Sequence, residues 1–231
     1  MSNEATKTRA IWGPDVMNLL RGQGIDIGCG PDPVLPHVDR FDFEQGDANT
    51  ITRYVQKQYD FVFSSHTLEH MVDRYAALGE WFALVKPGGH LIVLVPDEDL
   101  YEQGHFPSIF NTDHKSTFTI HRSQSWSPAS VNVSDLVRSV PGETVSVTLQ
   151  DHGYDRRLYR HGSTAWGRWL WPLARRVARR YPSAERLVFR TAYRLGAIID
   201  QTASDGRLAQ IQFIVRRPSS SRPAGRRSES E

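Results

Sequence analysis

The stretch GIDIGCGPDP, residues 24 to 33, decides the fold, because it runs a short apolar strand directly into a glycine turn. Parallel α/β sheets bind nucleotides at such a point, where a strand ends and glycines let the backbone approach the ligand. A dinucleotide fingerprint requires a third glycine, and Pro33 stands in its place, which argues against NAD. Asp26, just before the glycines, would repel a pyrophosphate and suits a ligand that carries an ammonium group.

Strands and helices alternate on both sides of this turn, as a parallel sheet with right-handed crossovers requires. Apolar runs of strand length follow it. A helix is predicted from the helical spacing of Leu68, Tyr75, Leu78, Phe82 and Val85, and the sequence Lys-Pro-Gly-Gly ends it. The predicted strands are 24–30, 38–43, 59–65, 90–96, 143–149 and 209–217, with a short helix at 132–140. We therefore expect an α/β fold, a doubly wound, Rossmann-like and mostly parallel seven-stranded sheet with a helical insertion before the last strand.

The chain of 231 residues suits one domain over residues 1–217, with an active-site loop at 98–130 and a basic helical insertion at 155–205. The tail, 218–231, is rich in Ser, Pro and Arg and is predicted to be disordered. Cys29 is the single cysteine, so a reducing compartment is expected. With no signal-peptide pattern and no long apolar run, the sequence predicts a cytoplasmic protein.

Four motifs in order resemble the class I S-adenosylmethionine-dependent methyltransferases, within them the small-molecule and glycan branch. The motifs are DIGCG at 26–30, GDA at 46–48, YDFVFSSHTLEH at 59–70 and LVKPGG at 84–89. The resemblance implies S-adenosyl-L-methionine as cofactor, and it implies the residues that bind it. The glycine turn would lie under the methionine part, Asp42 or its rival Glu44 would bind the ribose, and Asp47 and Ala48 would border the adenine. The implied cofactor-binding residues are Asp26, Gly28, Cys29, Gly30, Asp42, Asp47, Ala48, Ser64 and Ser65.

The string HTLEH at 66–70 also matches a zinc-protease pattern in which two histidines one helical turn apart bind the metal. That pattern needs the first histidine inside a helix, whereas residues 59–63 predict a strand that ends beside His66. His66 is therefore placed on a strand-to-helix turn at the substrate pocket, as a base or a group that shapes the cofactor site, and no metal is assigned. His70 is interpreted as a structural histidine.

The long loop supplies the preferred catalytic base, His114, with Asp113 as its orienting carboxylate. A hydroxyl is a weak nucleophile at neutral pH and gains from a histidine base. A capping aspartate beside a surface histidine is the structural alternative, and loop carboxylates and histidines that bind a divalent metal are another.

The insertion carries the strongest charge asymmetry in the chain. Between Arg156 and Leu195 there are eleven arginines and one carboxylate, Glu185. The segment 164–181 combines arginines with tryptophans, which is typical of a helix lying on an anionic membrane surface. A solvated helical hairpin and a phosphate track for RNA are the alternatives, and nucleic acid is the less favoured because the aromatic residues cluster at one end.

Together these patterns predict methyl transfer from S-adenosylmethionine to an oxygen of a small molecule or glycan. The basic segment suggests that this acceptor is anionic or lipid-linked. The protein would then be cytoplasmic and peripheral at the inner membrane face. An RNA-modifying enzyme and a non-catalytic cofactor-binding subunit are the competing functions.

Overall fold

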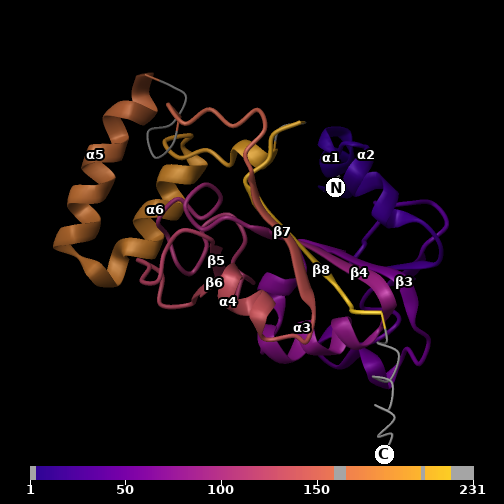
Figure 1. Ribbon diagram of the computed structural model, residues 1–231. Helices are drawn as coiled ribbons and strands as arrows, with labels where there is room; N and C mark the ends of the chain where they lie inside the picture. Colours follow the sequence, from indigo (N-terminus) through magenta and orange to yellow (C-terminus); the bar gives the residue numbers. More distant parts are fainter. Residues whose placement is uncertain (1–3, 159–164, 204–205, 220–231) are drawn as a thin grey trace, which may run out of the picture.

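A six-stranded mixed sheet forms the centre of the protein (Figure 1). The computed structural model describes residues 4–158, 165–203 and 206–219. The strand order is β2-β1-β3-β4-β8-β7, with β1 to β4 parallel and β8 antiparallel to both of its neighbours. The strands are β1 (Gly24–Ile27), β2 (Asp39–Phe41), β3 (Tyr59–Ser65), β4 (Val85–Pro96), β7 (Glu143–Gln150) and β8 (Gln210–Arg216).

The α/β class and the mostly parallel sheet are confirmed, but the prediction of seven strands is wrong. Between β2 and β3 the described chain forms one 3-10 helix, η2 (Ala48–Arg53), and no strand. The connection from β1 to β2, residues 28–38, likewise contains no helix. The connection from β1 to β2 is too short for the usual crossover helix, so the glycine turn is followed by irregular backbone.

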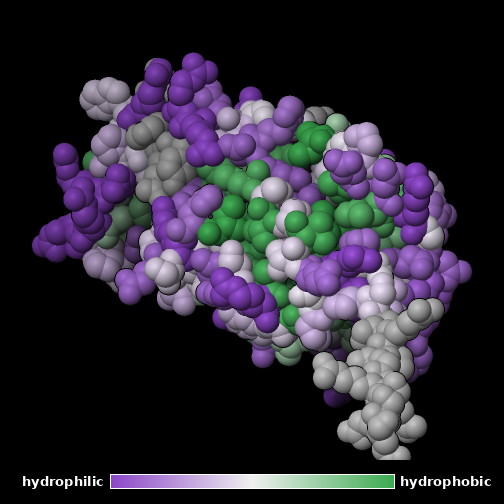
Figure 2. All heavy atoms as spheres, viewed as in Figure 1, coloured by the Kyte–Doolittle hydropathy of each residue, from purple (hydrophilic) through white to green (hydrophobic). Residues whose placement is uncertain are grey.

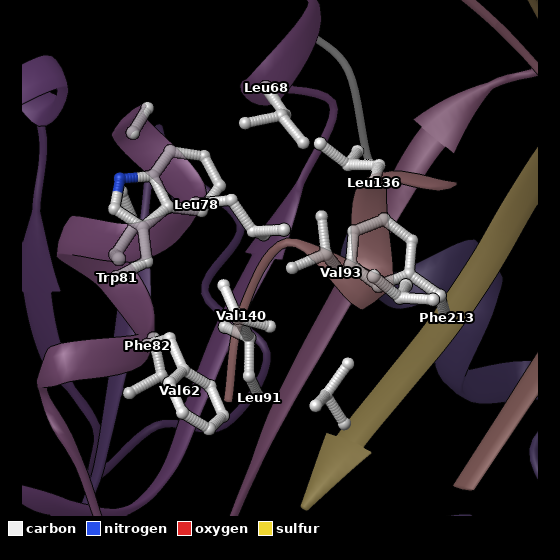
Figure 3. Packing of buried hydrophobic residues seen from close by; sticks show 14 of the residues in the cluster. Val62, Leu68, Leu78, Trp81, Phe82, Leu91, Val93, Leu136, Val140 and Phe213 are labelled. Carbon is white, nitrogen blue, oxygen red and sulfur yellow. The ribbon is translucent and has the colours of Figure 1, made fainter. Parts of the chain in front are cut away.

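Each face of the sheet is covered by its own helices. On one face, α3 (Arg74–Ala83) and α4 (Val133–Arg138) bury a large apolar cluster, in which Trp81, Leu78, Leu136 and Phe213 converge (Figure 3). The other face packs a smaller cluster under α1 (Glu4–Ile11), α2 (Pro14–Met17) and η1 (Asn18–Leu20). Burial on both faces explains the continuous apolar run of β4.

The insertion before β8 is a helical hairpin that projects from the end of the sheet (Figure 1). It comprises α5 (Ala165–Arg180), η4 (Pro182–Ala184), α6 (Glu185–Arg194) and η5 (Gln201–Ala203). The sequence PLARRVARRY at 172–181 predicts a helix that starts at Pro172, but this prediction is wrong, because α5 begins earlier and Pro172 lies inside it. A third apolar cluster joins the hairpin to the long loop, through Trp171 and Phe189 against Ile109.

The long loop is partly ordered by a small parallel pair, β5 (Thr117–Thr119) and β6 (Ser130–Asn132). A 3-10 turn, η3 (Leu68–His70), follows β3 and leads into α3. The tail at 218–231 was predicted to be disordered. From residue 220 onward this tail lies outside the described residues. Within the described chain, no helix combines the length and apolarity needed to cross a lipid bilayer.

Candidate active site

Two adjoining cavities lie at the carboxyl ends of β1 and β3, where the glycine turn begins. The larger, of about 740 Å³, is lined by Gly28, Phe41, Asp42, Phe43, Gly46, Asp47, Ala48, Asn49, His66, Thr67, His70, Met71, Val72, Asp113 and Lys115. The smaller, of about 220 Å³, is lined by Glu4, Ala5, Asp26, Gly28, Cys29, Gly30, Pro31, Asp32, Phe63, Ser65 and His66. Gly28 and His66 belong to both, so together the cavities make one continuous candidate site at the position where open α/β sheets bind ligands.

Asp26 is the buried anionic group of the smaller cavity. Its Oδ2 accepts a hydrogen bond from the Val34 N–H at 2.6 Å, whereas its buried Oδ1 has no hydrogen-bond partner among the described residues. Burial raises the pKa of Asp26 to about 7, against the opposing effect of the Val34 bond. A buried carboxylate oxygen without a partner is costly, and a cationic ligand donor would satisfy it.

The glycine turn is shaped by close contact and by a carboxylate brace. Gly28 has φ +73°, and a Cβ added there would lie 1.9 Å from the Thr67 hydroxyl oxygen. Gly30 has φ +50°, but among the described residues nothing lies within 4 Å of its Cβ position. The Gly30 N–H donates to Asp42 Oδ2 at 2.8 Å, and Cys29 accepts a hydrogen bond from Arg40.

Gly28→Ala is expected to remove ligand binding at this turn, whereas Gly30→Ala is the matched control with a milder effect. Both substitutions share the positive-φ cost of about 1 kcal/mol, but only the first drives a methyl group into Thr67. Urea unfolding and ligand titration of the two variants measure the difference. Equal loss of stability and binding in both would contradict the role of the Gly28–Thr67 contact.

Asp42, and not Glu44, provides a polar side chain in the wall of the larger cavity. Asp42 lines this cavity and accepts a hydrogen bond from the glycine turn, while the exposed Glu44 lines only an adjoining cavity that Asp42 also lines. Asp47 caps η2, since its side chain accepts a hydrogen bond from the Asn49 N–H at 2.9 Å. The Ala48 carbonyl accepts a hydrogen bond from the Trp81 indole N–H at 2.9 Å. The structure thus favours Asp42 over Glu44 as the residue that faces a ligand.

The two serines predicted for the pocket are separated by the alternation of β3. Ser64 is fully buried, and its hydroxyl donates to the Ile27 carbonyl at 2.9 Å, so it ties β3 to β1 and its prediction as a ligand contact is wrong. Ser65 points to the opposite side and lines the smaller cavity, with an Oγ that has no hydrogen-bond partner in the described chain.

His66 occupies the predicted turn after β3 in a left-handed conformation, φ +55°. Its Nε2 lies 2.8 Å from Gln210 Oε1 and its Nδ1 lies 3.5 Å from Glu69 Oε1. Burial alone would lower the pKa of His66, but the neighbouring Glu69 outweighs it and raises the pKa to about 9. Both ring nitrogens therefore face acceptor oxygens, and this environment favours the protonated form of His66 over a free base. Such strained, charged residues are typical of functional sites.

The histidine–carboxylate cluster, which we define as Glu69, His70, Glu102, Asp113 and His114, brings the long loop to η3. His114 Nδ1 lies 2.6 Å from Glu102 Oε1, while Asp113 lies on His70, with Oδ2 3.0 Å from Nδ1. The predicted pairing of Asp113 with His114 is therefore wrong, because the loop turns the two side chains to different partners. The Glu69 carbonyl accepts from two loop N–H groups, Lys115 at 2.8 Å and Ser116 at 3.2 Å, which fixes the loop against η3.

Sequence reasoning missed Glu69 and Glu102 as members of the site. Glu69 and His70 were visible in HTLEH, but their meeting with the loop depends on a contact 44 residues away in sequence, between His70 and His114, whose ring centroids are 5.0 Å apart. Glu102 was one of several polar candidates in the long loop, and its burial was not expected because a carboxylate in a polar loop is ordinarily exposed. Here it is fully buried.

The chain is similar to known proteins in its sequence and its fold. A family model described as "Methyltransferase domain" matches residues 10–157. The sequence matches no curated relative. Similar solved structures include a SAM-dependent methyltransferase from Archaeoglobus fulgidus, at 13% identity over 93% of this chain and 94% of that one, with a TM-score of 0.47. Another, at 13% identity over 95% and 83% with a TM-score of 0.50, is described as showing conversion of a disulfide bond into a thioacetal group during echinomycin biosynthesis. At these identities the likeness concerns the fold alone.

Proposed function

This chain belongs to the methyltransferase domain family and is a SAM-dependent methyltransferase, and from that premise we propose that it methylates an oxygen of a small molecule or glycan. The observation that carries the proposal is the continuous site that runs from Asp26 and Gly28 to His66 and His70. One end offers an unpartnered buried carboxylate oxygen, and the other offers titratable groups.

The residues present fit the cofactor. Asp26 Oδ1 is a buried acceptor in the smaller cavity, which suits the ammonium group of a methionine moiety. Gly28 leaves room where any larger residue would meet Thr67, and Asp42 stands in the larger cavity as an acceptor for ribose hydroxyls. S-Adenosylmethionine, when bound, supplies a methyl group on a positively charged sulfur, the electrophile of an in-line displacement.

The chain's own contribution to such a displacement is positioning and proton handling. His70 and Asp113 line the larger cavity, so an acceptor hydroxyl there meets the histidine–carboxylate cluster. His114 is oriented by Glu102 through Nδ1, and its Nε2 points toward Glu69 at 3.9 Å. We propose that His114 is the residue of this cluster on which activation of the acceptor depends, and that His66 holds a positive charge beside it.

The surface of α5 supports an anionic, lipid-linked acceptor such as a sugar on a polyprenyl phosphate. Three apolar side chains spaced four residues apart are exposed there, namely Trp169 (85%), Leu173 (52%) and Val177 (36%). Arginines stand among them, and hydrophilic residues dominate the outer edge of the molecule over α5 (Figure 2). The opposite side of α5 buries Trp171 and Ala178. An exposed apolar stripe flanked by cations fits an anionic membrane surface better than an RNA track, which needs no apolar stripe.

We expect the protein to pellet with vesicles that contain phosphatidylglycerol and to stay in the supernatant with pure phosphatidylcholine. Replacing Arg175, Arg176, Arg179 and Arg180 by Ala removes about 1 kcal/mol each near a charged surface, so affinity should fall at least about a hundredfold. Arg138→Ala, on α4, is the control and should pellet like wild type. Equal pelleting with both vesicle types, or no pelleting with either, would contradict the membrane hypothesis.

The acceptor itself is tested with radiolabelled S-adenosylmethionine against three pools, which are lipid-linked glycans, water-soluble sugars and phenols, and structured RNA. Label transferred to a hydroxyl of the first two supports the proposal. Label in RNA, with salt-sensitive RNA binding that the four-arginine variant loses, would instead identify an RNA-modifying enzyme.

A further inference from the structure

The histidine–carboxylate cluster contains a fully buried carboxylate, Glu69, that faces histidine rings without a close hydrogen bond. Glu69 has no exposed surface, and neither of its carboxylate oxygens has a hydrogen-bond partner within the described part of the chain. The ring nitrogens that approach Oε1 are His66 Nδ1 at 3.5 Å and His114 Nε2 at 3.9 Å. At these distances the buried carboxylate lacks the close hydrogen-bond donors that normally offset the free-energy cost of its desolvation.

Two histidines surround Glu69, and each is oriented by a carboxylate through the same ring nitrogen. His114 Nδ1 lies 2.6 Å from Glu102, and His70 Nδ1 lies 3.0 Å from Asp113. A carboxylate partner keeps the proton on Nδ1, which leaves the Nε2 lone pair of each ring available. Histidines that bind metals almost always have this arrangement, with the second nitrogen donating to a carboxylate.

We propose that Glu69, His70 and His114 bind a divalent transition metal ion. One ligand atom from each of the three residues can be chosen so that all lie within 4.8 Å of one another. Metal–ligand bonds of about 2.0–2.2 Å place ligand atoms roughly 3–4 Å apart, so the three side chains need to close by about an ångström. Glu102 and Asp113 orient His114 and His70, and His66 lies against the Glu69 carboxylate.

The ligand set selects among metals. Two imidazoles and one carboxylate suit Zn²⁺, Fe²⁺, Co²⁺ or Mn²⁺, whereas Mg²⁺ and Ca²⁺ prefer sites made of oxygen atoms. His70 lines the larger cavity, so the ion would lie at the cavity wall beside the expected acceptor. A role in acidifying an acceptor hydroxyl rests on the proposed function, whereas the binding of the ion does not.

Calorimetric titration of the full chain, stripped with a chelator and dialysed, with ZnCl₂, CoCl₂, MnCl₂ and MgCl₂ tests the proposal. We expect one equivalent of Zn²⁺ or Co²⁺ to bind, a rise in Tm with either ion, and little binding of Mg²⁺. Glu69→Gln and His70→Gln should each lose at least tenfold in affinity, and Asp113→Asn should lose less because Asp113 contacts His70 and not the ion. His121→Gln, an exposed histidine on the same loop, is the control and should bind like wild type.

Circular dichroism and unfolding of the metal-free variants show whether Glu69→Gln has simply failed to fold. His70→Gln replaces a partly exposed side chain and provides the second, less disruptive probe. Folded wild-type protein that binds none of the transition metals would overturn the proposal, as would binding that both variants retain. A titration with S-adenosylhomocysteine in the same preparation separates the two ideas, because cofactor binding without metal binding leaves the proposed function standing.

Discussion

Asp26→Asn is expected to abolish most cofactor binding while making the protein more stable at pH 8. The substitution preserves the shape of the side chain and an acceptor for the Val34 N–H, but it replaces the unpartnered Oδ1 by a neutral group in the smaller cavity. Loss of a hydrogen bond between charged groups costs about 1.5–3 kcal/mol. Titration with S-adenosylmethionine and S-adenosylhomocysteine should therefore show affinity reduced by about tenfold to a hundredfold.

The gain in stability follows from the sign of the pKa shift. Because burial raises the pKa of Asp26 from 3.8 to about 7, the folded chain holds this proton more tightly than the unfolded chain. The stability of the wild type therefore falls as pH rises from about 4 to 7, and a neutral Asn escapes that loss. Urea unfolding should show Asp26→Asn more stable at pH 8, by up to about 4 kcal/mol, and nearly unchanged at pH 4.

Asp39→Asn is the control for this experiment, since Asp39 lies on β2 and pairs with Lys57 at the surface. It should leave cofactor affinity unchanged. Wild-type affinity in Asp26→Asn, or a loss of stability that is the same at both pH values, would contradict the assignment of Asp26 as the buried carboxylate that meets the ammonium group.

His114→Gln is expected to lower the rate of methyl transfer by about 10²–10⁴-fold with cofactor affinity unchanged within about a factor of two. His114 is buried and does not line either cavity, so its removal leaves the cofactor walls intact. It does remove the Nε2 that faces Glu69 and the pairing with Glu102. Single-turnover rates with an acceptor found in the labelled screen measure the effect.

The matched variant is His121→Gln, which replaces a histidine seven positions further along the same loop. It should retain the wild-type rate and Tm, whereas His114→Gln leaves the buried Glu102 without its partner and should also lower the Tm. A His114→Gln enzyme that is fully active would show that the cluster is structural. A fall in kcat/KM carried by KM alone would show that His114 helps to bind the acceptor and does not assist the chemical step.

Local patterns predicted the α/β class and most of the strands, because these depend on residues close in sequence. The strand at 24–27, its glycine turn and the positions of Asp26 and Gly28 all follow from one decapeptide. Asp42 was placed correctly at the end of its strand. Family membership then confirmed the cofactor.

The acceptor end of the site could not be predicted in the same way, since it depends on where the long loop folds back against η3. Asp113 and His114 are adjacent in sequence, so a shared role was the natural hypothesis, but the loop backbone directs them to His70 and Glu102. Ser64 failed for a simpler reason, since alternation along β3 sends it to the interior. The missing seventh strand was signalled by the spacing of Asp42 and Asp47, which lie five positions apart, too close for a helix and a strand between them.

That short connection has a consequence for turnover. The segment after β2 carries Phe43, Glu44 and Gln45 on exposed backbone, with Phe43 97% accessible at the rim of the larger cavity. No strand or helix of the described chain intervenes there to close over the nucleoside end. Spent cofactor held on that side should therefore have a short residence time, and its departure should not limit the catalytic cycle, in contrast to enzymes whose lids must open before product leaves.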